Sequence, residues 1–218
     1  MGVLSAREIV TFEDAPPPPG ASPWVAGPEP FTDVQVVAPD PSWPERYQTL
    51  AEVITEALGA FALAVEHVGS TSVPGLAAKP VIDIDLTVVD SRDEQAYVPT
   101  LERHGFALVI REPWWYEHRC LRRHDPACNL HVFSPECAEA ERHRIFRDWL
   151  RSHPEDRSLY AVAKASAADL TRATGGHAMD YNARKEPVVR EIYSRAFHAL
   201  GLAPLTGAAR GDPDRNGG

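Results

Sequence analysis

The chain has 218 residues, of which 22 are basic and 31 are acidic, so its formal net charge is −9 with histidine neutral. This length suits one domain with short appendages, and a hydrophobic content of 44% excludes wholesale disorder. The acidic balance argues against a protein that coats long nucleic acids, and no stretch approaches the roughly 20 apolar residues of a membrane span.

Both ends of the chain differ in composition from its middle. Ten of the 20 prolines fall within the first 44 residues, and the run PPPPG at 16–20 is typical of an extended or flexible arm. Residues 206–218 contain no large apolar side chain, which is typical of a frayed tail. We therefore expect a flexible arm over 1–32, one folded domain over 33–205 and a disordered tail over 206–218.

The N-terminus lacks the apolar core of a signal peptide, and three cysteines are an odd number that suits reduced thiols. These features predict a cytoplasmic protein. They also leave no reason to expect a membrane as a partner.

Hydrophobic periodicity and turn residues predict mixed helices and strands in the first half of the chain and helices alone in the second. In chain order we expect a helix at 43–58, strands at 63–68 and 81–89, a helix at 93–104, strands at 106–111, 114–122 and 129–133, and helices at 134–152, 154–174 and 179–200. Ser134 and Pro135 suit the start of the first C-terminal helix, and Pro187 should kink or restart the last. This order predicts an α+β fold with a mixed sheet and a helical C-terminal half.

The strand predicted at 81–89 carries two acidic residues in an otherwise apolar run. Because side chains alternate along a strand, Asp83 and Asp85 share one face and repel each other unless a cation lies between them. Oxygen ligands at this spacing suit Mg²⁺ or Mn²⁺ rather than zinc. A strand with one solvated face is the competing interpretation, but the apolar flanks favour a buried strand whose acids have a function.

A loop rich in glycine, serine and proline precedes this strand. Gly69 allows a ligand to approach the backbone closely, Ser70 adds a hydroxyl donor, and Lys79 could counter phosphate charge. Together with the carboxylate pair they form a workable cradle for a triphosphate. A plain turn and a solvated lysine are the alternatives.

This combination resembles the DNA polymerase beta-type nucleotidyltransferase superfamily, and the string HVGSTSVPGLAAKPVIDI at 67–84 resembles the GrpB family within it. The resemblance covers about 33–197. Further similar segments are Val36-Val37, 41–44, His118-Arg119, 129–132, 146–151, Tyr160, Lys164, Tyr181 and Lys185. The fold that it implies is a nucleotidyltransferase-like mixed sheet.

The resemblance also implies roles for individual residues. Gly69, Ser70 and Thr71 would face the nucleotide phosphates, Asp83 and Asp85 would hold the divalent metals, and Lys79 and Arg119 would neutralise charge. A third acid is usual on a later strand, and His131 or Glu117 would stand in that place. The wall of the substrate pocket would include Glu117, Arg147, Tyr160, Lys164, Tyr181 and Lys185.

The histidines and cysteines between 118 and 137 invite a zinc interpretation, but their spacings do not match the tight pairs of structural zinc sites. His131 is a better candidate for phosphate binding or catalysis. Cys120 has one histidine on its strand face and nothing else that would activate it, so a buried, inert thiol is favoured.

The sequence thus favours a metal-dependent nucleotidyltransferase that moves a nucleoside monophosphate from a nucleoside triphosphate to a small acceptor, with Asp83, Asp85 and His131 as catalytic residues. The alternative is a non-catalytic binding module for nucleotides or coenzyme A precursors, because the GrpB family also occurs fused to dephospho-coenzyme A kinases. A third hypothesis is an interaction protein that acts through its Pro-rich arm. Under the first two hypotheses, deletion of 1–30 should leave the site intact.

Overall fold

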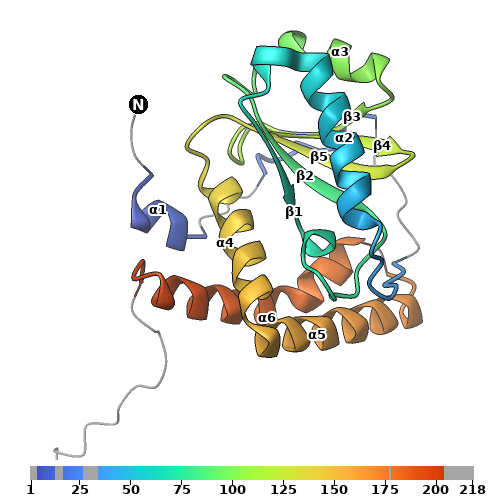
Figure 1. Cartoon of the computed structure of the whole chain (residues 1–218). Helices are drawn as coiled ribbons and strands as arrows, with labels where there is room; N and C mark the ends of the chain where they lie inside the picture. The colour runs from blue at the N-terminus through green and yellow to red at the C-terminus, as the bar shows by residue number, and fades with distance from the viewer. Residues whose placement is uncertain (1–3, 13–16, 27–33, 177, 204–218) are drawn as a thin grey trace, which may run out of the picture.

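The computed structural model describes residues 4–12, 17–26, 34–176 and 178–203. Its centre is a five-stranded mixed sheet with the order β1-β2-β5-β4-β3 (Figure 1). The strands are β1 (Ala64–Val68), β2 (Ile82–Thr87), β3 (Ala107–Glu112), β4 (His118–His124) and β5 (Ala127–Phe133). β2 and β5 pair in parallel, and the other neighbours are antiparallel.

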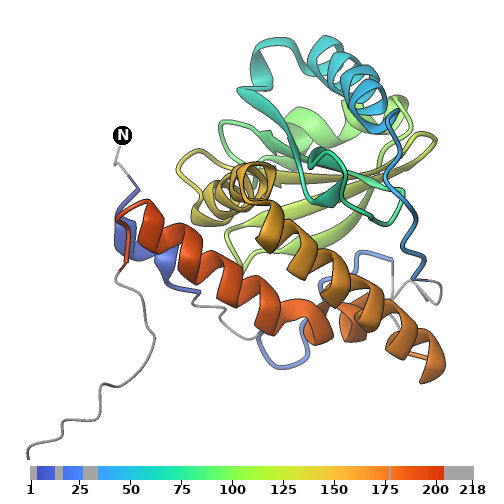
Figure 2. The same cartoon turned by 60° about the horizontal axis from the view of Figure 1, so that its bottom comes forward.

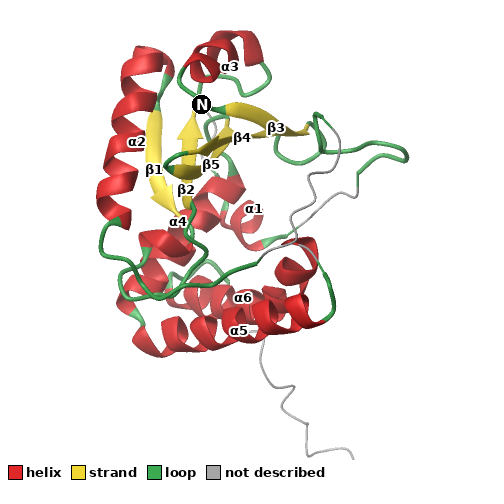
Figure 3. Cartoon of the chain, turned by 90° about the vertical axis from the view of Figure 1, so that its right-hand side faces the viewer, coloured by secondary structure: helices red, strands yellow, loops and turns green. Residues whose placement is uncertain are grey.

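Helices cover the sheet in two groups. The helices are α1 (Ala6–Val10), α2 (Trp43–Leu58), α3 (Glu94–Arg103), α4 (Ala138–Ser152), α5 (Pro154–Ala173) and α6 (Ala178–Ala199), with single 3₁₀ turns η1 (Gly59–Phe61) and η2 (Ser70–Ser72). α2 runs alongside β1 (Figure 3), and α2 and α3 pack together on one side of the sheet. α5 and α6 lie side by side below the sheet and α4 connects to them (Figure 2).

The main core lies between the sheet and the α2–α3 layer. Leu50, Ile54 and Leu58 recur at helical spacing on α2 and are buried against Ile84 and Leu86 of β2. Because side chains alternate on a strand, the acidic side chains of β2 point to the opposite face, toward the helical half. The α+β architecture is the one that the sequence predicts.

Several predicted boundaries are wrong in an informative way. Residues 114–117 form a turn rather than a strand, since Tyr116 and Glu117 have φ values of 52° and 50°. Helix α4 begins at Ala138, not at Ser134, because Glu136 has a positive φ of 60° that a helix cannot contain. The Ser134 hydroxyl accepts a hydrogen bond from the Ser91 amide at 3.0 Å instead of capping the helix. Helix α6 continues through Pro187 without a restart.

The prediction of a flexible arm over 1–32 is wrong for residues 4–12. A capping box between Ser5 and Glu8 starts α1, and Ile9 is buried in a cluster with Ile145, Tyr193 and Phe197 of α4 and α6. The tail predicted at 206–218 lies outside the described residues. Within the described ranges, no helix combines the length and apolar character that a membrane crossing requires.

Candidate functional site

A cavity of about 610 Å³ lies between the polar face of the sheet and the helical half. Residues from the loop before β2, from four strands, from the 114–117 turn and from α4, α5 and α6 line it. The polar ones include Gly69, Ser70, Thr71, Lys79, Asp83, His118, Asn129, His131, Glu139, His143, Lys164, Tyr181 and Lys185.

The Gly69–Ser72 turn forms one wall and is tied down by α4. The Ser72 hydroxyl donates to the Gly69 carbonyl at 2.6 Å. Arg151 donates to the Ser72 carbonyl at 2.9 and 3.0 Å, and Arg147 donates to the His67 carbonyl at 3.1 Å. The two arginines therefore hold the turn in place from the adjacent helix, and neither of them lines the cavity.

Gly69 meets the Asp83 side chain so closely that no side chain fits there. Its φ of 65° and ψ of −168° belong to a region of backbone conformation that is essentially restricted to glycine. A Cβ at this position would lie 2.9 Å from the Asp83 Cβ and closer still to Oδ2. The backbone of the turn is thus packed directly on the carboxylate.

We expect Gly69→Ala to lower the free energy of unfolding by roughly 1–3 kcal/mol from backbone strain, with a further loss from the clash with Asp83. Gly75→Ala is the matched control, because Gly75 also has a positive φ (77°) but has open space around its Cα. Urea unfolding of both variants measures the difference. Equal losses at the two positions would contradict the close contact with Asp83.

Asp83 is the acidic side chain of β2 that faces the cavity. Its register partner on β5 is Asn129, whose amide donates to Oδ1 at 2.9 Å. Burial opposes ionisation, but the nearby His131 imidazole, the Asn129 amide and Lys79 outweigh it and lower the pKa of Asp83. Asp83 is therefore an anion in a cavity that contains cationic groups.

Asp85 does not share this cavity position, because a histidine of α4 covers it. His143 Nδ1 lies 2.9 Å from Asp85 Oδ2, and His143 Nε2 lies 3.3 Å from Glu139 Oε1. Asp85 is 3% exposed. Desolvation alone would lower the pKa of His143, but Asp85 and Glu139 outweigh it and raise that pKa well above 6.5. The group is a half-buried imidazolium between two carboxylates.

Three side chains on neighbouring strands form a hydrogen-bonded row that ends in the cavity: Glu112 of β3, His118 of β4 and His131 of β5. His118 Nδ1 lies 2.8 Å from Glu112 Oε2, and His118 Nε2 lies 3.0 Å from His131 Nδ1. His131 Nε2 is 4.0 Å from Asp83 Oδ1. Desolvation lowers the pKa of His118 to about 4, so this ring is neutral at physiological pH.

Three lysines gather on the side of the cavity formed by the loop before β2 and by α5 and α6. Lys164 Nζ donates to the Ala77 carbonyl at 2.6 Å, and Lys185 Nζ lies 3.5 Å from the Tyr160 hydroxyl. Burial and the neighbouring Lys185 lower the pKa of Lys164 to about 7. Burial also lowers the pKa of Lys79, with Lys185 acting in the same direction and Asp83 against it.

Most of the residues predicted from the sequence come together here. Gly69, Ser70, Thr71, Lys79, Asp83, His131, Lys164, Tyr181 and Lys185 line the cavity. Asp85 lies beside it under His143, and the Tyr160 hydroxyl lies next to Lys185.

Three predicted residues lie elsewhere. Arg119 follows His118 on β4 and so points to the opposite face, where its Nε donates to Glu94 at 2.6 Å. Glu117 stands in the 114–117 turn, 41% exposed, with Arg119 at 3.6 Å, so it is not a third acid of the site. Arg147 contacts the backbone behind the turn, as described above.

The zinc interpretation finds no support in the described ranges, where no group of three or more histidine, cysteine or acidic side chains converges on a metal position. Cys120 is buried, and burial raises the pKa of its thiol, as expected for an inert cysteine. The sequence interpretation missed Glu112, His118, Asn129, Glu139 and His143 as members of the site. The spacing of Glu139 and His143, four residues apart on one helix, was the available signal for that pair.

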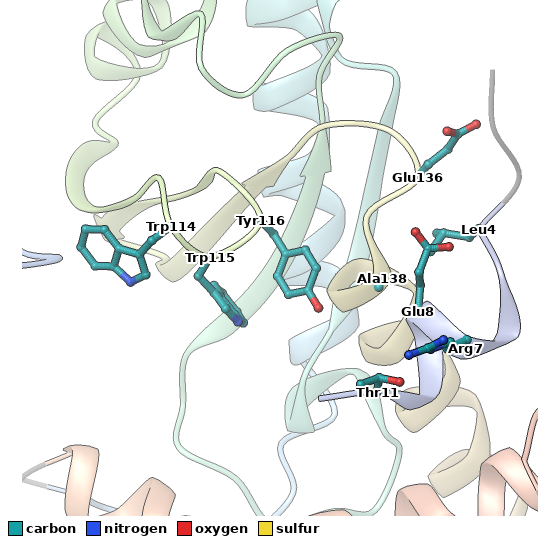
Figure 4. Close-up of a pocket in the computed structure, with 9 residues that line it drawn as sticks. All are labelled: Leu4, Arg7, Glu8, Thr11, Trp114, Trp115, Tyr116, Glu136 and Ala138. Carbon is teal, nitrogen blue, oxygen red and sulfur yellow. The ribbon is translucent and has the colours of Figure 1, made fainter. Parts of the chain in front are cut away.

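A second cavity of about 470 Å³ lies between α1 and the 114–117 turn (Figure 4). Trp114, Trp115 and Tyr116 line one side, and Arg7 and Glu8 of α1 line the other. Trp115 also lines the main cavity, so the two cavities are neighbours.

The mixed sheet, the helical half and the polar cavity between them define an α+β protein whose candidate site lies between the polar face of the sheet and the C-terminal helices. A family model described as GrpB protein matches residues 33–195, and the chain belongs to the GrpB family. Both the family and the fold class predicted from the sequence are confirmed.

Relatives and a solved structure agree with this assignment. A UPF0157 protein of Halalkalibacterium halodurans is 50% identical over 157 residues, which are 72% of this chain and 79% of that protein. A dephospho-CoA kinase of Mycolicibacterium paratuberculosis is 34% identical over 191 residues, which cover 75% of this chain but 46% of the kinase. The crystal structure of conserved protein GrpB from Enterococcus faecalis matches with a TM-score of 0.67 and 28% identity, covering 77% of this chain and 99% of that one.

Proposed function

We propose that the main cavity binds a nucleoside triphosphate and that the protein transfers its nucleotidyl group to a small-molecule acceptor. The observation that carries this proposal is the meeting of the Gly69–Ser72 turn with three lysines around one carboxylate, Asp83. The resemblance of the turn and of the acidic strand to nucleotidyltransferases supports it. The similarity to dephospho-CoA kinases, whose name implies a nucleotide substrate, points in the same direction.

The electrostatics favour an anionic ligand. Burial and mutual repulsion lower the pKa values of Lys79 and Lys164, and Asp83 offsets only part of this effect. A phosphate group among Lys79, Lys164 and Lys185 would remove the repulsion and restore their charge. The Ser70 hydroxyl and the backbone amides of the turn are further donors for phosphate oxygens.

The fit to Mg²⁺ or Mn²⁺ is different for the two acids of β2. Nucleotide-associated Mg²⁺ is usually held by one or two carboxylates together with the substrate phosphates, not by a complete protein cage. Asp83, 30% exposed at the cavity wall, fits this arrangement. Asp85 is occupied by His143 at 2.9 Å, so a second ion there would have to displace the imidazolium.

Each group of residues in the cavity has a separate role in the proposed transfer. The lysines and the turn hold the phosphates, and Asp83 holds one divalent ion. That ion, when bound, would neutralise phosphate charge and favour the departure of pyrophosphate. His131 stands at the cavity end of the hydrogen-bonded row, beside Asp83, where it can take the proton of the acceptor.

The first experiment is a thermal-shift screen of ATP, GTP, CTP, UTP and coenzyme A precursors with Mg²⁺, Mn²⁺ or EDTA. A metal-dependent rise in Tm with one triphosphate would support the proposal and identify the donor. A rise with a coenzyme A precursor alone would favour a non-catalytic binding module. That alternative draws on the finding that no three histidine, cysteine or acidic side chains of the described residues converge on a metal position.

For the triphosphate that the screen identifies, Lys185→Gln should raise Kd about tenfold, since a charged contact to phosphate is lost. Arg184→Gln is the matched control, because Arg184 is exposed on the same helix and donates to Thr174 at 3.3 Å, outside the cavity. Isothermal titration calorimetry measures both. An equal change in Kd for the two variants would mean that the triphosphate responds to the net charge of the protein and does not contact Lys185.

Asp83→Asn should lower the rate of pyrophosphate release about 100-fold or more, on the scale typical of a charge-stabilising group in a transfer reaction. The Asn129 amide then faces an amide oxygen, so the fold should persist. Replacing Asp85 as well would be a poorer test, because it breaks the buried pair with His143. Full release by the single variant, with unchanged nucleotide affinity, would argue against Asp83 in the transfer step.

A further inference from the structure

The second cavity has one aromatic wall and one polar wall. Trp114, Trp115 and Tyr116 follow one another in the turn before β4, and in Figure 4 their side chains form a row with Tyr116 nearest to α1 and Trp114 farthest from it. Arg7 and Glu8 lie across the cavity from this row. The volume of about 470 Å³ falls within the range of roughly 300–1,000 Å³ that is usual for small-molecule sites. The cavity is therefore large enough for a small organic ligand.

One buried guanidinium holds both walls in place. The Arg142 side chain is fully buried, and its Nη2 donates to the Tyr116 hydroxyl at 2.8 Å. Its Nη1 donates to the backbone carbonyls of Glu8, Ile9 and Thr11 at 3.1–3.3 Å. Neither wall can move without breaking these bonds, so the cavity is preorganised for a ligand.

The backbone at two points of the lining has an unfavourable conformation. Tyr116 and Glu136, which both line the cavity, have φ values of 52° and 60°. With Glu117 at 50°, they are the three residues other than glycine that have a positive φ in the described part of the chain. Such strain persists only where the surrounding structure enforces it, and it gathers at ligand-binding sites. Its concentration beside this cavity agrees with a function for the turn.

We propose that the second cavity binds a planar heteroaromatic ring, which stacks on the aromatic wall and turns its polar edge toward Arg7 and Glu8. Stacking on indole and phenol rings gives affinity for any planar ring, since each has a π-face. An aliphatic ligand would cover the guanidinium and the carboxylate without giving them partners. The nitrogen and oxygen atoms of a heteroaromatic edge can both donate to and accept from these two side chains.

Trp115 connects this site to the main cavity, because it lines both. Its ring packs edge-on against His118 at 5.1 Å and against Tyr116 at 5.4 Å. Binding of a ring concerns the second cavity alone, whereas its use in a transfer reaction rests on the function proposed above. The ring would then belong either to the base of the triphosphate or to an aromatic acceptor. The wall formed by α1 lies outside the region 33–195 that the family model matches.

The test labels the full chain with 5-fluorotryptophan and records ¹⁹F NMR spectra. The five tryptophans are assigned by single replacements with phenylalanine. The probes are nicotinamide, benzimidazole, the four ribonucleosides, the four ribonucleoside triphosphates and inorganic triphosphate, each at millimolar concentration. A ring in the second cavity should shift the resonances of both Trp114 and Trp115. Trp24, which lies outside both cavities, should not respond, and a ligand confined to the main cavity should shift Trp115 without Trp114.

Calorimetry with Trp114→Ala distinguishes the two sources of the ring. If the base of the triphosphate occupies the cavity, the variant should raise Kd for the triphosphate about tenfold and leave Kd for inorganic triphosphate unchanged. If a separate molecule occupies it, only the affinity for the free ring compound should fall. Trp114→Phe keeps a ring and should retain most of the affinity in either case. Trp24→Ala is the matched control, because Trp24 is also half-buried.

The outcomes separate this proposal from the function proposed above. If Trp114 responds to no probe, the proposal is overturned, whatever the main cavity binds. Triphosphate binding that shifts Trp115 alone would, with that result, leave the nucleotide site standing. A response of Trp114 to a ring compound, without binding of any triphosphate, would support the second site and contradict the proposed transfer reaction.

Discussion

His143→Ala should lower the free energy of unfolding by about 3–5 kcal/mol, the usual cost of removing one partner from a buried ion pair. The imidazolium lies between Asp85 and Glu139, and Asp85 is almost completely buried. Its removal leaves that carboxylate, only 3% exposed in the fold, without its cationic partner. Urea unfolding followed by circular dichroism measures the loss.

Two comparisons make this result specific. His124→Ala removes an exposed histidine at the end of β4 and should change stability by less than about 0.5 kcal/mol. Asp85→Asn combined with His143→Gln removes both charges and should recover part of the loss, so a double-mutant cycle isolates the pair. Additive effects of the two single changes would contradict a direct interaction.

The pair also predicts how stability depends on pH. The folded-state pKa of His143 is raised above its unfolded value, so its contribution is complete below about pH 6.5 and is lost as pH rises through the folded-state pKa. The stability gap between the wild type and His143→Gln should therefore be full near pH 6 and shrink on the alkaline side. A gap that stays constant across this range would mean that His143 is not an imidazolium in the fold.

The alternation of side chains on β2 could be predicted from the sequence, because an apolar run with acids at every second position has one physical solution in a buried strand. The sequence also predicts a close approach to the backbone at Gly69, although the group that approaches it in the fold is the Asp83 side chain and not a ligand. Both features depend on local pattern. They needed no knowledge of how distant parts of the chain meet.

The contribution of α4 could not be predicted in this way. Glu139 and His143 lie in a helix rich in charged residues, where their spacing brings them together but does not show that they face the sheet and not solvent. Only the packing of α4 against β2, more than fifty residues earlier in the chain, turns them into partners of Asp85. The prediction that Arg119 binds the nucleotide is wrong for a related reason. Alternation along β4 places Arg119 and His118 on opposite faces, and only the strand pairing in the fold shows which face holds the site.

One buried arginine gives the clearest evidence against the prediction that the N-terminal segment is a flexible arm. Arg142 of α4 is fully buried, and its Nη1 donates to the backbone carbonyls of Glu8, Ile9 and Thr11 at 3.1–3.3 Å. Its Nε donates to Glu139 at 2.7 Å, the same acid that faces His143. A segment outside the matched region of 33–195 is thus joined to the candidate site through two side chains.

Deletion of residues 1–12 should therefore destabilise the protein by about 3 kcal/mol or more. It removes three acceptors from a buried guanidinium, where each unsatisfied group costs about 1–3 kcal/mol, and it exposes the apolar surface around Phe197. Arg142→Met should produce a loss of similar size, whereas Arg144→Met, half exposed on the same helix, should have little effect. Urea unfolding compares the four proteins. A deletion variant as stable as the full chain would restore the interpretation of this segment as a dispensable arm. It would also mean that α1 does not stabilise the connected side chains Arg142, Glu139, His143 and Asp85 beside the cavity.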